Sequence, residues 1–262
     1  MYLGCINKFL QDGFVPIIDL QNYKNIFNGY NINSLNENPW EIFFHQPFNF
    51  TLNNVIKNGK NIKIFKCSSN YFRPDFYIFN NKVLNDFWHN VENIYIPLRK
   101  EIIHEKNIIK SKLFKGSKNL LGILVRGTDY VALRPRGHPI PPNKELVIKD
   151  IIEFDKKNKY DFFFISTEDD MLREVFIKQF GHKLKCLTYD KKINYNYKKK
   201  QLLGHNENIK GNIKFTKIYL LNMIMLAECI DIICANTSGT IGVFIFKNGF
   251  RYKKVYNIGY YK

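Results

Sequence analysis

The stretch Leu120-Leu-Gly-Ile-Leu-Val-Arg-Gly-Thr-Asp-Tyr130 joins an uncharged apolar run to a short polar segment, Arg126-Gly127-Thr128-Asp129. The apolar residues 120–125 are typical of a strand that is buried on both faces of a parallel sheet. Open α/β sheets bind their ligands at the carboxyl ends of such strands. An arginine at that position offers a planar donor fork for phosphate oxygens. The alternative is an ion pair between Arg126 and Asp129 that only fixes the loop.

The chain has 262 residues, 45% of them hydrophobic, which is enough to bury a substantial core in one large domain or two small ones. It has no run of about 18 consecutive apolar residues, so no membrane span is expected. The N-terminus lacks the basic lead and long apolar core of a signal peptide. Five scattered cysteines without metal-ligand spacing favour buried free thiols in a reducing compartment, and hence a cytoplasmic location.

The formal net charge is +17. Lys, Asn and Ile are over-used along the whole chain, as an A/T-rich coding sequence would produce without selection for a basic surface. One dense basic run, Lys191–Lys200, lies in a polar stretch that is typical of a loop. A basic protein attracts polyanions and acidic lipid, so peripheral contact with an anionic membrane is a hypothesis. Dedicated nucleic-acid binding is not expected, because no nucleic-acid motif accompanies the charge.

Strand and helix patterns alternate along the chain, which predicts an α/β protein with parallel sheets. The first part favours a helix at 2–11, strands at 14–19 and 62–67 and one long helix at 83–102. The polar segment 106–118 is the expected domain junction. The second part favours strands at 120–125, 162–166, 184–188, 230–234 and 254–258, with helices at 144–157, 170–180, 214–228 and 240–247.

These patterns predict two Rossmann-type domains, an N-terminal α/β domain at 1–110 and a C-terminal domain at 111–262. The N-terminal domain is expected to be reduced. It opens directly in a helix, without the strand and glycine-rich turn that normally come before the first helix of such a domain.

Three expected strand ends in the second part carry polar clusters, at Arg126–Asp129, Ser166–Asp170 and Asn236–Thr240. In one βαβ domain these clusters converge on a common crevice. A cation and the N–H groups of a helix start suit a diphosphate, and carboxylates suit ribose or base hydroxyls. The alternative is that the second and third clusters are plain helix caps, and both interpretations can hold together. Neither a P-loop nor a G-x-G-x-x-G segment is present.

The order of four blocks, Val125–Asp129, His138–Ile140, Ser166–Asp170 and Asn236–Gly239, resembles the nucleotide-sugar domain of GT-B glycosyltransferases. The resemblance is to the group that includes the α1,6-, nodulation-factor, α1,2- and protein O-fucosyltransferases, and it covers about residues 120–246. The segments Gly13–Asn22 and Asn38–Phe44 are similar in type to the acceptor-side domain of bacterial surface-polysaccharide enzymes.

The resemblance implies a glycosyltransferase that moves fucose or a related sugar from a GDP-sugar to a surface glycan, free or lipid-linked, with inversion at the anomeric carbon. It implies no metal and no cofactor besides the donor substrate. Arg126 would contact the β-phosphate and stabilise the departing diphosphate. Ser238 and its neighbouring N–H groups would hold the same diphosphate. The remaining implied donor-binding residues are Gly127, Thr128, Thr167, Glu168, Asp169, Asn236, Thr237 and Gly239.

The chain departs from that group at two places. Many members have two basic residues where this chain has Arg126-Gly127, which leaves one phosphate contact in question. The loop Val131–Gly137 has no Asp or Glu to serve as general base, so Asp129 and His138 are the local candidates. Asp129 can equally brace the loop, and His138 can equally order it. A catalytically degenerate nucleotide-sugar-binding protein and a basic nucleic-acid-associated protein are the alternative functions.

Overall fold

The computed structural model describes residues 2–23, 37–59, 61–65, 74–188 and 212–262. Its centre is a five-stranded sheet in the order β3-β2-β1-β4-β5, in which every neighbouring pair is parallel. The strands are β1 (Leu120–Leu124), β2 (Phe162–Ser166), β3 (Leu184–Cys186), β4 (Asp231–Ala235) and β5 (Lys253–Tyr256). All five lie within two residues of the bounds that the sequence predicts, because each is an apolar run between polar turns.

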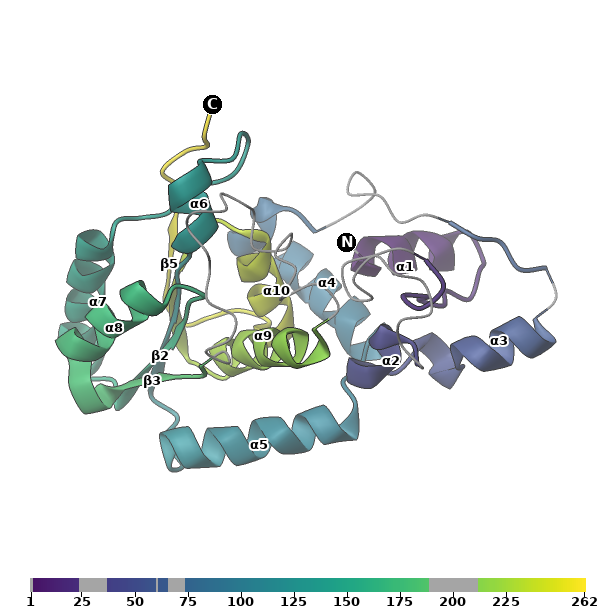
Figure 1. Cartoon of the computed structure of the whole chain (residues 1–262), viewed down its shortest axis with the longest axis horizontal. Coiled ribbons are helices and arrows are strands. Elements are labelled where there is room, and N and C mark those ends of the chain that lie inside the picture. Colours follow the sequence, from purple (N-terminus) through teal and green to yellow (C-terminus); the bar gives the residue numbers. More distant parts are fainter. Residues whose placement is uncertain (1, 24–36, 60, 66–73, 189–211) are drawn as a thin grey trace.

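Helices cover both faces of the sheet (Figure 1). On one face, α7 (Lys144–Asn158) and α8 (Asp170–Phe180) pack against side chains such as Leu121 and Ile123. On the other face, α9 (Ile213–Ala227) and α10 (Ser238–Lys247) pack against Leu120 and Leu124. Successive strand residues point to opposite faces, so a strand covered on both sides must be apolar throughout. The uninterrupted run at 120–125 follows from this arrangement.

Gly122 allows α9 to approach the sheet closely. A methyl group at this position would lie 3.2 Å from Cδ2 of Leu226 and 3.3 Å from Cβ of Cys229. Both neighbours belong to the buried cluster on that face of the sheet. The single glycine in β1 therefore brings α9 close to the strand that leads to Arg126.

The N-terminal part is helical in the described residues. Its elements are α1 (Tyr2–Gln11), α2 (Pro39–Phe43), η1 (Pro47–Asn49), α3 (Leu52–Asn58), η2 (Phe76–Phe79), α4 (Lys82–Tyr95) and α5 (Lys100–Phe114). Figure 1 shows α1, α2 and α3 on the far side of α4 from the sheet. A small separate core holds this region together and contains Ile6, Ile18, Leu20, Trp40 and Ile96.

The strand predicted at 14–19 is wrong. These residues are extended, but side-chain amides replace the neighbouring strand that would be needed. The N–H of Ile18 donates to Oε1 of Gln46 at 2.9 Å, and the N–H of Leu20 donates to Oδ1 of Asn38 at 3.1 Å. The strand predicted at 62–67 is likewise not formed at residues 62–65, and its last two residues lie outside the described part. The basic run Lys191–Lys200 also lies outside it.

The single helix predicted at 83–102 is two helices, α4 and α5, separated by a break around Pro97. A proline has no N–H to donate and disfavours the helical conformation of the residue before it. The polar segment 106–118, expected as a junction, continues α5 as far as Phe114. Trp88 and Val91 of α4 belong to the same buried cluster as the sheet. A helix and a shared core therefore cross the predicted domain boundary at 110/111.

The cysteines divide into two groups in the described residues. Cys186, Cys229 and Cys234 are free, as expected, whereas Cys5 is disulfide-bonded, so the expectation of free thiols throughout is wrong at that position. None of the described helices combines the length and the apolar character that crossing a bilayer requires.

Candidate functional site

The three polar strand ends lie side by side at one edge of the sheet. The chain leaves β1 toward β2 on one side and reaches β4 on the other, so the order of strands reverses between β1 and β4. Ligands of open α/β sheets bind outside the carboxyl ends of the strands at such a reversal. Leu124 is in register with Ser166 of β2 and with Cys234 of β4. Two residues further along, Arg126, Glu168 and Asn236 therefore emerge at the same level.

Arg126 is held between an acid and an aromatic ring. Its Nε lies 3.3 Å from Oε1 of Glu168, and 25% of the arginine side chain and 12% of the glutamate side chain are exposed. Its guanidinium carbon lies 4.1 Å from the centre of the Tyr130 ring. Among the described side chains, Glu168 from the neighbouring strand end is an acid beside Arg126. An acid at Nε and a ring against the guanidinium plane together restrict the orientation of the group.

Gly127 is required by the close approach of Asp169. A methyl group on Gly127 would lie 2.2 Å from Oδ2 and 2.8 Å from Cβ of Asp169, distances that no side chain tolerates. Gly127 is also the residue before α6 (Thr128–Leu133), a short helix that the sequence does not predict. Thr128 and Asp129 form the first turn of α6, and their side chains lie outside the described part of the structure.

The second cluster is mainly a helix start. Asp169 caps α8 by accepting from the N–H of Leu172 at 3.0 Å, and its own N–H donates to Oγ1 of Thr167 at 3.2 Å. Both side chains are buried. The capping alternative therefore accounts for Thr167 and Asp169, and Glu168 is the member of this cluster that contacts Arg126.

The third cluster begins α10. Oγ1 of Thr237 accepts from the N–H of Thr240 at 3.4 Å, so Thr237 is the helix cap. Ser238 is exposed and Gly239 is partly exposed at the first two helical positions. The N–H groups of the first turn have no partner within a helix, and the helix dipole adds partial positive charge there. This end of α10 therefore suits an anion, and the Thr237 cap leaves that property intact.

Tyr219 of α9 is a candidate site residue that the sequence analysis missed. Its hydroxyl lies 3.0 Å from where a methyl group on Gly239 would be. Although 42% of the residue surface is exposed, burial around the hydroxyl raises its pKa. The positive charge of Arg126 opposes that rise, and the negative charge of Glu168 adds to it. A tyrosine within an apolar helix carries no sequence signal of this placement.

His138 lies one aromatic ring away from Arg126. Its imidazole packs edge-on against Tyr130, with ring centres 5.2 Å apart, on a ring that also contacts the guanidinium. The loop around His138 is held by the C-terminal tail. Tyr261 donates its N–H to the carbonyl of His138 and accepts from the N–H of Gly137, at 3.0 and 2.9 Å. The sequence pattern does not predict this pairing, because the two segments are far apart in the chain.

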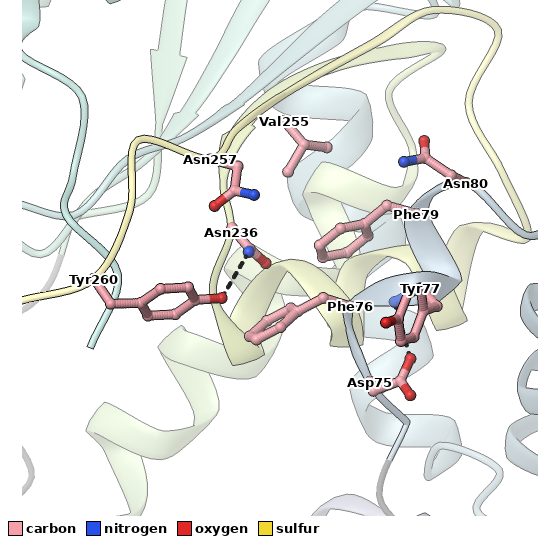
Figure 2. Close-up of a pocket in the computed structure, with 9 residues that line it drawn as sticks. All are labelled: Asp75, Phe76, Tyr77, Phe79, Asn80, Asn236, Val255, Asn257 and Tyr260. Carbon is pink, nitrogen blue, oxygen red and sulfur yellow. Dashed lines mark hydrogen bonds between the residues drawn. The ribbon is translucent and has the colours of Figure 1, made fainter. Parts of the chain in front are cut away.

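Asn236 contributes to a neighbouring pocket. It is buried at the end of β4, and its Nδ2 donates to the hydroxyl of Tyr260 at 3.2 Å. The pocket has a volume of about 400 Å³ and is bounded by η2 on one side and by the ends of β4 and β5 on the other (Figure 2). Of the predicted donor-binding residues, Asn236 is the one whose side chain faces this pocket.

The site combines a guanidinium and the N-terminal end of a helix of ten residues. Both favour negative charge, and they come from adjacent strands at the point where the strand order reverses. A diphosphate bound there would be met from two sides. Within the described residues, no group of three or more His, Cys, Asp and Glu side chains has an arrangement that could hold a metal ion.

No family model matches the chain, and no curated protein matches it by sequence. Solved structures do match. NodZ alpha-1,6-fucosyltransferase soaked with GDP-fucose aligns at a TM-score of 0.52 and 15% identity, over 93% of this chain and 86% of that one. Fucosyltransferase NodZ from Bradyrhizobium aligns at 0.52 and 14% identity, over 93% and 85%. NodZ alpha-1,6-fucosyltransferase co-crystallized with GDP aligns at a TM-score of 0.50 and 14% identity, over 93% of this chain and 85% of that one. At these identities the likeness concerns architecture: the chain has the GT-B fold of these fucosyltransferases, and the predicted fold class is confirmed.

Proposed function

We propose that this protein is a metal-independent, inverting glycosyltransferase that transfers fucose or a related sugar from a GDP-sugar to a glycan acceptor. The observation that carries the proposal is that Arg126 and the N-terminal end of α10 follow the carboxyl ends of two adjacent strands, at the β1–β4 reversal. The match in fold to a fucosyltransferase whose crystals were soaked with GDP-fucose supports the same donor class.

In this proposal the diphosphate of the donor lies between Arg126 and the first N–H groups of α10, at Ser238 and Gly239. As the glycosidic bond breaks, negative charge grows on the β-phosphate. Donors that are already in place stabilise this charge most effectively, because they need no reorganisation during the reaction. Glu168 and Tyr130 hold the guanidinium in position. Tyr219, beside Gly239, lines the same space.

The acceptor hydroxyl attacks the anomeric carbon from the face opposite the leaving GDP, and it loses a proton as it attacks. The group that takes the proton must come within about 3 Å of the hydroxyl. His138 is the described candidate, because it lies against Tyr130 beside Arg126 and is partly exposed. Asp129 remains the second candidate for this role.

Thr167, Asp169 and Thr237 act in this proposal by building the two helix starts, and Gly127 acts by making room for Asp169. Asn236 lies between the diphosphate site and the neighbouring pocket. Thr128 contributes to the donor site through its place in the first turn of α6.

The acceptor in this proposal is a glycan of the cell surface, free or linked to lipid. The protein acts in the cytoplasm, a location that rests on the free thiols Cys186, Cys229 and Cys234 and not on Cys5. The charge of +17 would hold it against anionic membrane. Flotation with anionic vesicles that disappears at high salt would support this contact, and no flotation at low salt would remove it. Dedicated nucleic-acid binding is no part of the proposal.

The proposal is tested by measuring GDP-fucose binding and GDP release from the same preparation, with and without EDTA. We expect binding, and slow release of GDP with water as acceptor, at rates that EDTA does not change. Binding without release on any acceptor would favour a degenerate donor-binding protein. That alternative draws on the absence of an acid between Val131 and Gly137. Failure to bind either GDP or GDP-fucose would contradict both.

A further inference from the structure

The pocket beside the diphosphate site is lined mainly by aromatic rings and side-chain amides, together with the carboxylate of Asp75 and the side chain of Val255 (Figure 2). Aromatic rings and side-chain amides face it from η2, from the ends of β4 and β5 and from the C-terminal tail. They belong to Phe76, Tyr77, Tyr260, Asn80, Asn236 and Asn257. The N-terminal and C-terminal parts of the chain thus build it jointly. Its volume of about 400 Å³ falls within the range of small-molecule sites.

The side-chain oxygen of Asn236, at the wall of the pocket, has no hydrogen-bond donor among the described residues. The residue is only 6% exposed, and its Oδ1 accepts no hydrogen bond within the described part of the chain. Buried polar atoms are nearly always paired, because an unpaired one loses its hydration without compensation. A ligand that carries hydroxyl groups would supply the missing donor. The Nδ2 of the same amide is already engaged by Tyr260.

Two tyrosines at this pocket keep large exposed surfaces. Tyr77 is 76% exposed and Tyr260 is 45% exposed. Figure 2 shows Tyr260 beside Asn236 on the β4–β5 side of the pocket, and Phe76 and Tyr77 on the η2 side. Exposed aromatic rings and side-chain amides suit a pyranose ring. Its face of C–H groups packs on an aromatic ring, and its hydroxyls hydrogen-bond to amides.

The pocket lies on the β4–β5 side of the diphosphate site, and Glu168 lies on the β1–β2 side. Asn236 belongs to the pocket and is followed directly by Thr237, the cap of α10. A nucleotide-sugar has its nucleoside at one end of the diphosphate and its sugar at the other. Asn236 joins the pocket to the start of α10, so the pocket adjoins the diphosphate site and is placed to hold a group attached at one end of the diphosphate.

We infer that this pocket binds a pyranose ring of the transfer reaction, with Asn236 and Tyr260 hydrogen-bonding its hydroxyls and Tyr77 contacting its face. The inference rests on the proposed function. The ring is either the sugar of the donor or the sugar of the acceptor, and both would be recognised by the same chemistry.

The test uses the full chain and two variants, Tyr77→Ala in the pocket and Tyr252→Ala as a matched control. Tyr252 is 52% exposed, directly precedes β5 and is not among the residues that line the pocket. Affinities for GDP and GDP-fucose are measured by calorimetry. Retention on an array of hexose and N-acetylhexosamine oligosaccharides is measured with GDP present. Tyr260→Phe is a second variant, which keeps the ring and removes the hydroxyl bonded to Asn236.

We expect Tyr77→Ala and Tyr260→Phe to keep the affinity for GDP and to weaken sugar binding by about fivefold or more. If the pocket holds the donor sugar, the loss appears in GDP-fucose affinity. If it holds the acceptor, the loss appears on the array. The inference is overturned if both variants match Tyr252→Ala in both sugar measurements, or if they weaken GDP itself, which would indicate a nucleobase pocket. Wild-type protein that binds no GDP contradicts the proposed function separately, and the array still tests the pocket.

Discussion

The chemistry of the candidate site depends on how the neighbouring side chains hold one guanidinium. Arg126 projects from the end of a strand that is buried on both faces, and Glu168 and Tyr130 restrict its orientation. A cation that is already ordered loses little conformational entropy when it binds an anion. At the residue scale, the affinity of the site for an anion therefore depends as much on the neighbours of Arg126 as on its charge.

Gly127 gives the sharpest prediction at this scale. Gly127→Ala places a methyl group 2.2 Å from a carboxylate oxygen of Asp169, so the cap of α8 or the start of α6 must shift. We expect the free energy of unfolding to fall by about 1–3 kcal/mol, measured by urea denaturation. Gly242→Ala is the matched control, because a methyl group there meets nothing within 4 Å and lies in α10.

For Gly242→Ala we expect the free energy of unfolding to rise by about 0.5–1 kcal/mol, because alanine favours a helix more than glycine does. Equal effects of the two substitutions would mean that Gly127 is present for reasons other than the contact with Asp169.

The sequence predicts the residues of the site that follow strands, and it misses those that arrive from elsewhere. Arg126, Glu168 and Ser238 follow apolar runs, so their place at the carboxyl edge could be read from the chain. Tyr219 reaches Gly239 from the middle of α9, and Tyr260 reaches Asn236 from the C-terminal tail. Such contacts depend on tertiary packing, which no local pattern encodes.

At the scale of elements, the strands and helices of the sheet region follow from their apolar periods and turn residues. The N-terminal part does not. Residues 14–19 have the composition of a strand, yet amides of Asn38 and Gln46 bind the backbone that a neighbouring strand would otherwise bind. A strand exists only with a partner, and the sequence gives no information on that partner. Pro97 is a sequence signal for the break between α4 and α5, because proline disfavours a helical conformation of the residue before it.

The junction between α5 and the end of α9 gives an element-scale prediction. Glu228 accepts hydrogen bonds from Lys106 and Lys110 of α5. Burial alone would raise the pKa of Glu228, but these bonds and charges lower the pKa below its ordinary value of 4.5. A lowered pKa means that the folded state favours the carboxylate. The stability that it contributes is present above pH 4.5 and is lost as the pH falls through the folded-state pKa.

Glu228→Gln should therefore lower the melting temperature at pH 7, by an amount equivalent to about 1 kcal/mol. The difference from wild type should shrink as the pH falls through the folded-state pKa of Glu228, because the wild-type side chain then becomes neutral as well. Glu153→Gln serves as control, because Glu153 is 57% exposed and its contact with Lys157 is long, at 3.7 Å. A difference that does not depend on pH would show that packing, not charge, joins α5 to α9.

At the scale of the whole molecule, the order of the five strands decides where the site is. The reversal between β1 and β4 brings together segments more than a hundred residues apart, and the register places them at one level. The alternation of strand and helix patterns in the sequence predicts an α/β protein with a parallel sheet, but it does not distinguish this strand order from other orders of the same five strands. The division into domains at 1–110 and 111–262 stays a prediction. The helix α5 and one buried cluster extend across that boundary.

The central claim is that Arg126 and the start of α10 form a diphosphate site. Calorimetry of GDP binding to wild type, Arg126→Ala and the control Arg99→Ala tests it most directly. Arg99 is a half-exposed arginine paired with Glu101, in the N-terminal half of the chain. We predict that Arg126→Ala weakens GDP binding by about ten- to hundredfold, the loss of one charge-assisted contact, with an unchanged circular dichroism spectrum. Arg99→Ala should bind as wild type does. Equal GDP affinity in all three folded proteins would contradict the claim.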